Sequence, residues 1–417
     1  MMSNQDGKWW NKKISRRDML KLTGAGAAGV AIGASGFGGV MNAMGYDVFE
    51  SVVGDASNKV EFYGKHQAGI TTPVQKHVFF AALTVVSSKE DLRELFKKWT
   101  PLVVRLTNGE LMADPSTNTR IPTSDTGESV GLDASNLTIT FGVGPSLFDK
   151  FHISHLKPSE LVDLPHFPKD QLVEEWTGGD LCIQACADDP QVAFHAVRNL
   201  VRAGSGKVEI KWSQAGFTSF PADGSTPRNL FAFKDGSVNP SKKEENDVIW
   251  IQPGESKSWL TGGTYLVARK IQMHLETWDR TSLKDQEATF GRYRDSGAVF
   301  GKKGEFDDFD VEEKDVNSNY IIPDTSHVHL ARKSGAQMLR RSYSYASGVM
   351  TKTGAHDAGL LFISFQKHPS QFIKVQNSLG RMDKLNEYVT HRGSALFACF
   401  PGVQKGSYIG EAFFNAL

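Results

Sequence analysis

Three short segments of the chain contain the side chains that could carry out redox chemistry at a bound iron. Asp235 lies in the run NLFAFKDGSVNP, where the following Gly236 lets a bulky group approach the backbone closely. Further along, His327 and His329 lie in SHVHLA, and Arg340 lies in MLRRSY. An imidazole can bind haem iron, a carboxylate can move a peroxide proton, and a guanidinium can stabilise charge at a cleaving O–O bond. Together these residue types meet the needs of peroxide chemistry at a haem.

The same runs resemble the signature segments of the dye-decolourising peroxidase family. FKDGSVNP resembles the Gly-x-x-Asp-Gly signature, with Ala232 in place of the first glycine. HVHLA and LRRSYSY resemble the segments with the proximal histidine and the distal arginine. The resemblance extends over roughly residues 60–417 and is to the secreted branch, the deferrochelatase/peroxidases of bacterial iron-uptake operons. We expect the Ala232 methyl group to tighten the haem edge without loss of activity.

The resemblance implies one haem b per chain and a role for each matching residue. His327 would bind the iron, Asp235 would be the distal acid/base, and Arg340 would stabilise O–O cleavage. His329 is the competing ligand, and it lies where many relatives have an arginine that contacts a haem propionate. The remaining residues expected at the haem are Gly236, Ser237 and Phe362.

Four further residues have two interpretations each. Asn239 would hold the Asp235 loop or a distal water, or it is a turn residue before a proline. Arg341 is on the strand face opposite Arg340, and is either structural or directed at a propionate. Asp383 and Glu387, on a helix predicted over residues 369–390, could accept a hydrogen bond from the iron-binding histidine, or be solvent-exposed.

The expected activity is oxidation of phenolic or dye-like donors by hydrogen peroxide. An alternative is an iron-uptake component that releases iron from haem or oxidises ferrous iron. A third is a haem-binding or storage module on the same scaffold. Hydrogen peroxide, small electron donors and the twin-arginine translocase are the expected partners; an iron-uptake permease and a second copy of the chain are left open.

The first 46 residues read as a signal for export. The run SRRDMLK differs from the common twin-arginine pattern only at Met19, and a weakly apolar stretch follows over residues 22–40. This route carries folded proteins, which suits a chain that takes up its cofactor before export. We expect the protein in the periplasm or at the cell envelope or outside it. Retention as a short membrane anchor is the alternative.

Charge and cysteine content exclude some classes of protein. The first 45 residues carry six of the 47 basic residues and two of the 47 acidic ones, so the remainder has 41 basic and 45 acidic residues. Nothing in this balance indicates a nucleic-acid partner. The three cysteines form no Cys-x-x-Cys pair, which argues against a zinc ribbon and against covalently attached haem.

The order of the predicted elements favours an α+β fold of two ferredoxin-like halves. Strands and helices alternate as β-α-β-β-α-β in the first half, where Ser88 and Asp189 are the expected caps of the two helices. The same order returns in the second half, with helices expected over 275–290 and 369–390 and strands over 264–274, 338–345, 359–366 and 394–400. Alternation along the strand at 359–366 keeps Phe362 and Phe365 from facing the same side unless the strand twists or bulges. The resemblance implies that the antiparallel sheets of the halves pack together in a dimeric α+β barrel. The expected domains are residues 47–222 and 223–417, with haem held in the second. The acidic segment at residues 301–319 is expected to be a solvated insertion.

Overall fold

Nine antiparallel strands form one sheet in the part of the chain that this computed structural model describes, residues 58–113, 118–351 and 353–417. The order is β5-β9-β2-β3-β1-β4-β7-β8, and β8 also pairs with β5, so eight strands close into a barrel. The short β6 pairs with β8. The strands are β1 (His77–Val85), β2 (Thr138–Val143), β3 (Leu181–Ala187), β4 (Val208–Phe217), β5 (Thr264–Met273), β6 (Leu339–Arg340), β7 (Tyr343–Val349), β8 (His356–Gln366) and β9 (Val389–Cys399).

Each half of the barrel is a ferredoxin-like unit, which confirms the predicted fold class. The strand order is β4-β1-β3-β2 in the first half and β9-β5-β8-β7 in the second. Few residue pairs join the halves: Phe217 pairs with Ser344 between β4 and β7, and β2 meets β9 at Gly142 and Val143. The domain boundary at residue 222 stays a prediction, and the expected signal segment lies outside the described residues.

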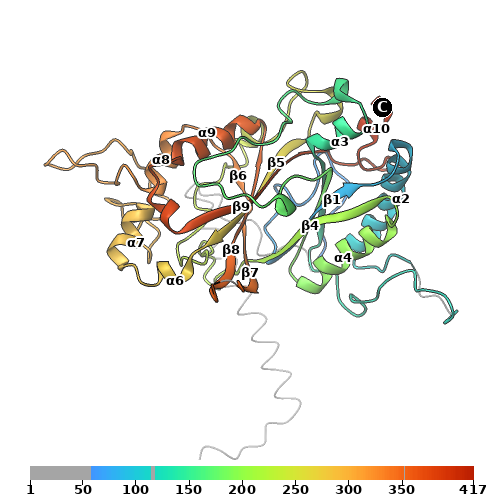
Figure 1. Cartoon of the computed structure of the whole chain (residues 1–417), viewed down its shortest axis with the longest axis horizontal. Coiled ribbons are helices and arrows are strands. Elements are labelled where there is room, and N and C mark those ends of the chain that lie inside the picture. Colours follow the sequence, from blue (N-terminus) through green and yellow to red (C-terminus); the bar gives the residue numbers. More distant parts are fainter. Residues whose placement is uncertain (1–57, 114–117, 352) are drawn as a thin grey trace, which may run out of the picture. The chain divides into compact units, whose positions relative to one another are not determined.

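Helices pack on the outer faces of the sheet. Figure 1 shows α2 and α4 beside the strands of the first half, and α8 and α9 beside those of the second. No helix within the described ranges is long and apolar enough to cross a membrane. The helices are α2 (Lys89–Thr107), α3 (Pro145–Lys150), α4 (Pro190–Ala203), α5 (Glu245–Val248), α6 (Leu275–Trp278), α7 (Leu283–Phe290), α8 (His327–Lys333), α9 (Pro369–Leu379) and α10 (Glu411–Ala416), with short 3-10 turns η1 (Ser154–Leu156), η2 (Glu174–Trp176), η3 (Ser258–Leu260) and η4 (Lys384–Glu387).

Local signals in the sequence predicted the start of two long helices correctly. The Ser88 side chain accepts a hydrogen bond from the Asp91 amide at 3.0 Å and caps α2. The Asp189 side chain caps α4, whose first residue is Pro190. Such caps satisfy amide groups that have no partner within the helix, and they depend only on neighbouring residues.

Strand β8 separates the barrel interior from the face that carries the site. Leu361 and Phe365 are fully buried in the interior cluster, whereas Leu360 and Phe362 line a cavity on the outer face. This alternation confirms the prediction that Phe362 and Phe365 do not share a face.

Four predicted elements are wrong in extent. The helix expected over residues 369–390 ends at Leu379, and β9 begins at Val389 rather than near residue 394. The helix expected over 275–290 is divided into α6 and α7, because Ser282 caps a new helix through the Asp285 amide. The strand expected over 338–345 is interrupted at Arg341, whose guanidinium donates to backbone carbonyls of the N-terminal arm.

Ala232 has a backbone conformation that favours glycine. Its φ is 66°, in the left-handed region, where an L side chain costs about 1–2 kcal/mol. The residue is exposed and does not line the cavity, which argues against the expected contact of its methyl group with a haem edge. The glycine of the family signature would relieve this strain.

We therefore expect Ala232→Gly to stabilise the protein by up to about 1 kcal/mol, because relief of strain outweighs the added freedom of the unfolded chain. Thermal or denaturant unfolding would measure this. Ala215, which is exposed on β4, provides the matched control, and its replacement by glycine should destabilise by about 0.5–1 kcal/mol. A loss of stability in Ala232→Gly would contradict the prediction.

Candidate functional site

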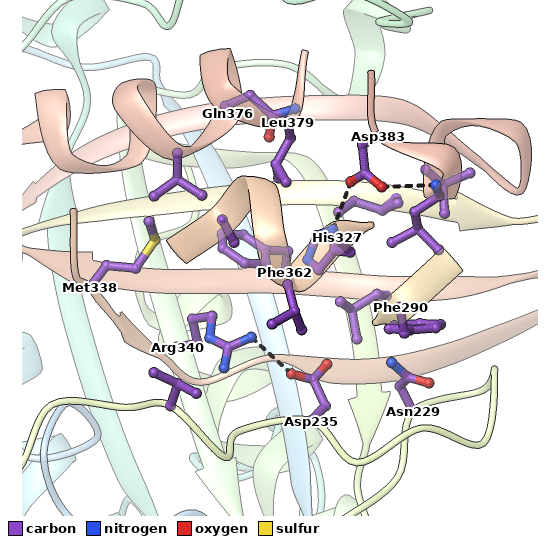
Figure 2. A pocket seen from close by; sticks show the side chains of 18 of the residues that line it. Asn229, Asp235, Phe290, His327, Met338, Arg340, Phe362, Gln376, Leu379 and Asp383 are labelled. Atoms are coloured by element: carbon purple, nitrogen blue, oxygen red, sulfur yellow. Dashed lines mark hydrogen bonds and ion pairs between the residues drawn. The ribbon is translucent and has the colours of Figure 1, made fainter. Parts of the chain in front are cut away.

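A cavity of about 470 Å³ lies on the outer face of β5, β8 and β9, beneath α8 and α9. Six of the eight predicted site residues line it, and Figure 2 labels four of them, Asp235, His327, Arg340 and Phe362. The six are Asp235, Gly236, Ser237, His327, Arg340 and Phe362. The other two, Asn239 and His329, are not among its lining residues.

His327 is the first residue of α8 and is oriented by a buried carboxylate. Its Nδ1 lies 2.7 Å from Asp383 Oδ2, and the other Asp383 oxygen accepts the Leu385 amide at 2.9 Å. A carboxylate can only accept here, so Nδ1 carries the proton and Nε2 keeps its lone pair. The prediction that Asp383 supports the histidine is confirmed, although Asp383 caps η4 rather than lying on a long helix. Glu387, the other candidate, is exposed.

His329 faces away from the cavity wall that His327 forms. Two residues along a helix correspond to a rotation of about 200°. The ring is buried, and its Nδ1 donates to the Ile322 carbonyl at 3.0 Å. The Ser326 side chain accepts the His329 amide at 3.4 Å and caps the helix. Because α8 begins at His327, the two histidines point to different sides of the helix, and only His327 of the two lines the cavity.

Asp235 and Arg340 form an ion pair in the cavity. Arg340 Nη1 lies 3.3 Å from Asp235 Oδ1, and both side chains are about a quarter exposed. Gly236 has a φ of 113°, which lets the chain turn directly after the carboxylate. In the view of Figure 2, His327 and Phe362 lie above this ion pair.

Asn239 connects the Asp235 segment to the strand of Arg340. Its Nδ2 donates to the Arg340 carbonyl at 2.9 Å, and its Oδ1 accepts the Arg340 amide at 3.0 Å. The residue therefore positions the backbone of Arg340 and does not touch the cavity. The neighbouring Arg341 is buried and donates to the carbonyls of Thr72 and Pro73, so it is structural.

Arg292 adds a buried cation to the cavity wall that the sequence did not reveal. Its Nη1 donates to the Gly297 carbonyl at 2.6 Å, and it forms no ion pair with any carboxylate of the described segments. Burial and the charge of Arg340 lower its pKa to about 10, against the opposing effect of Glu305. A single arginine after Gly291 has no sequence pattern that would have marked it.

Two further basic residues, Arg269 and His391, lie at another part of the cavity wall. Arg269 is fully buried and forms an ion pair with Asp170. Burial, together with the charge of Arg269, lowers the pKa of His391 to about 3, so this imidazole stays neutral. Neither residue was predicted, because each lies within a strand whose apolar pattern dominates.

The cavity combines three chemical functions at one place. His327 offers a nitrogen whose orientation a carboxylate fixes, as in metal-binding histidines. Asp235 offers a proton acceptor beside a permanently charged guanidinium. The surrounding side chains are largely apolar, and they include Phe231, Phe290, Phe362, Leu379 and Val389. This arrangement can bind a flat apolar cofactor with an iron and protonate or deprotonate a small ligand next to it.

Family models match both halves of the chain. Residues 67–218 match the model of the Dyp-type peroxidase N-terminal domain, and residues 226–404 match that of the C-terminal domain. Residues 13–33 match the twin-arginine translocation pathway signal sequence, which indicates export by that pathway.

Relatives of known name and solved structures agree with these matches. A deferrochelatase of Escherichia coli (strain K12) is 37% identical over 418 residues, which cover 95% of this chain and 96% of the relative. The crystal structure of a DyP-type peroxidase from Streptomyces coelicolor is 33% identical with a TM-score of 0.79, and covers 85% of this chain and 97% of that one. A DypB variant of Rhodococcus jostii RHA1, solved in complex with heme, shares the fold at 20% identity with a TM-score of 0.58, covering 81% of this chain and 96% of that one.

Proposed function

This chain belongs to the Dyp-type peroxidase family, and from that premise we propose that it uses hydrogen peroxide to oxidise phenolic or dye-like donors at a haem bound by His327. The family consists of haem-binding peroxidases, so the chain is an enzyme. The residue roles and the donor class are the proposal.

The residues that line the cavity fit a haem. With Nδ1 of His327 held by Asp383, Nε2 is the ring nitrogen for the iron. The aromatic and aliphatic walls suit the porphyrin face. Arg292, a buried cation with no carboxylate partner in the described ranges, suits a propionate, and we assign it that contact in place of His329. We propose one haem b per chain.

Asp235 and Arg340 have different roles in the reaction with hydrogen peroxide: Asp235 transfers a proton and Arg340 stabilises charge. Haem, when bound, supplies the iron that takes the oxidising equivalents of hydrogen peroxide. Asp235 accepts the proton of one peroxide oxygen and returns it to the other, which then departs as water. Arg340 keeps its charge throughout and stabilises the negative charge that develops on the departing oxygen. Asn239 positions Arg340 through two hydrogen bonds to its backbone.

The observation that carries this proposal is the convergence of the Asp235–Arg340 pair and the Asp383-held His327 on one cavity. Stopped-flow absorption of the haem-loaded protein mixed with hydrogen peroxide tests it. We expect a rapid change of the Soret band, and recovery when a phenol is added while the phenol is oxidised. A Soret band that does not respond to peroxide would leave a haem-binding or storage protein.

Release of iron from haem is the second candidate function, and the names of the deferrochelatase relatives favour it. The two activities leave different products. Iron release yields metal-free porphyrin, which fluoresces, whereas peroxidase turnover yields oxidised donor and retains the haem. Product analysis after incubation with a reductant, and separately with peroxide and a phenol, would tell them apart.

We propose the periplasm or the outer part of the cell envelope as the site of action, because the twin-arginine signal directs export of the folded chain. The translocase and hydrogen peroxide are then partners of this protein. An iron-uptake permease and a homo-oligomer stay predictions.

A further inference from the structure

Glu305 departs from the behaviour expected of its segment. The acidic residues 301–319, between α7 and α8, were predicted to form a solvated insertion, and the structure contradicts this for Glu305. Its side chain is only 7% exposed, whereas Asp308 and Glu313 on the same segment are 97% and 48% exposed. Burial of a carboxylate is costly unless it is paired and hydrogen-bonded, so its partners identify its role.

The partners of Glu305 are the two residues that flank Asp235 and Gly236. Its Oε2 accepts from Lys234 Nζ at 2.7 Å, and its Oε1 accepts from Ser237 Oγ at 2.6 Å. One carboxylate therefore holds both sides of the turn that presents Asp235 to the cavity. The Glu305 backbone carbonyl also accepts from Arg292 Nη1 at 3.3 Å, which connects the same residue to the cavity wall.

Gly297 leaves room for the contact between Lys234 and Glu305. Gly297 has a φ of 77°, and a Cβ there would lie 2.6 Å from Lys234 Cδ and 3.3 Å from Glu305 Cγ. A side chain at this position would require the Lys234 side chain to shift from its present place beside Glu305. Arg228 adds a second link, because its Nη2 donates to the Asp295 carbonyl at 2.9 Å.

Glu305 also controls the charge next to Asp235. Burial tends to raise the pKa of the Glu305 carboxyl, but hydrogen bonds from Lys234, Ser237 and Thr226 outweigh it and hold the pKa below its ordinary value. The carboxylate is thus ionised at neutral pH and neutralises the Lys234 ammonium. Lys234 and Asp235 both line the cavity, so loss of Glu305 would leave an unpaired ammonium in the same cavity as the Asp235 carboxylate.

We propose that Glu305 is a positioning residue for the peroxide reaction, which fixes the Asp235 turn through Lys234 and Ser237 and keeps Lys234 away from the Asp235 carboxylate. The inference rests on the proposed role of Asp235. It assigns a functional role to Glu305 alone within the acidic segment, because this residue outside the signature run holds that run in place.

Single-turnover stopped-flow kinetics of the haem-loaded protein tests this inference. We expect Glu305→Gln and Glu305→Ala to slow the reaction with hydrogen peroxide about 10- to 100-fold, since a misplaced reactive group costs rates of this order. The Soret band before mixing, and the later step in which a phenol restores the starting spectrum, should be unchanged. The double variant Lys234→Met/Glu305→Gln should recover part of the rate, because it removes the freed ammonium. Glu313→Gln, which alters an exposed pair with Lys302 on the same segment, is the matched control and should react as the unaltered protein does.

The outcomes separate this inference from the proposed function. An unaltered protein that ignores peroxide would overturn the function itself. If Asp235→Asn loses the reaction while both Glu305 variants keep it, only the role of Glu305 fails. Loss of haem from both Glu305 variants, with haem retained in Glu313→Gln, would assign Glu305 to the integrity of the cavity and overturn its positioning role.

Discussion

Replacement of His327 by alanine is expected to yield a protein that does not retain haem through purification. His327 is the residue of α8 that lines the cavity with a ring nitrogen free to bind iron, because Asp383 occupies its Nδ1. Removal of the imidazole deletes the bond to iron and leaves only contacts with the porphyrin. The measurement is the Soret absorbance per protein after haem loading and desalting.

Two variants calibrate this result. Asp383→Asn should weaken haem binding about 10- to 100-fold, because it removes the negative charge that orients the ring and raises its basicity. His329→Gln should keep the full Soret band, since His329 is held by the Ile322 carbonyl and does not line the cavity. A full Soret band in His327→Ala, together with its loss in His329→Gln, would transfer the iron ligand to His329.

Replacement of Arg340 by leucine should leave haem bound and lower the rate constant for the reaction with hydrogen peroxide about 10²–10³-fold, the usual cost of one donor at a developing negative charge. The guanidinium is the partner of Asp235 at 3.3 Å, and leucine cannot supply its charge. Arg340→Lys keeps a positive charge without the planar fork, so we expect a smaller loss. Stopped-flow absorption at the Soret band measures both rate constants.

Asp235→Asn provides the comparison for the rate loss expected in Arg340→Leu. It should slow the same step about 10²–10⁴-fold, because the amide cannot accept the peroxide proton. Since Asp235 and Arg340 act on one bond, the double variant should lose little more than the slower single variant. Additive losses, or a rate unchanged in either single variant, would argue against a joint role.

The sequence predicted correctly those features that depend on near neighbours. Ser88 and Asp189 begin their helices as predicted, because a cap bonds to amides within three residues. Strand β8 presents Phe362 and Phe365 to opposite faces, because successive side chains alternate. The β-α-β-β-α-β order likewise repeats along the chain and predicted the ferredoxin-like halves.

Predictions failed where a local stop signal was overlooked or where a distant segment supplied a partner. The apolar periodicity after Pro369 continues towards residue 390, but α9 ends at Leu379 with Gly380 as its C-cap. This places Asp383 in a turn that reaches His327, 56 residues away in sequence. The acidic composition of residues 301–319 likewise indicated solvation, although Glu305 is buried against a turn about 70 residues earlier.

By itself, the sequence determined the fold class, the export signal and the residue types of the site. Only the tertiary structure decided which residues act together: His327 rather than His329 at the cavity, Asp383 rather than Glu387 behind it, and Glu305 and Arg292 beside the distal pair. The physical reason is the distance along the chain. Asp235 meets Arg340 across 105 residues, and packing of the Asp235 segment against β6, with two hydrogen bonds between Asn239 and the Arg340 backbone, brings them to 3.3 Å.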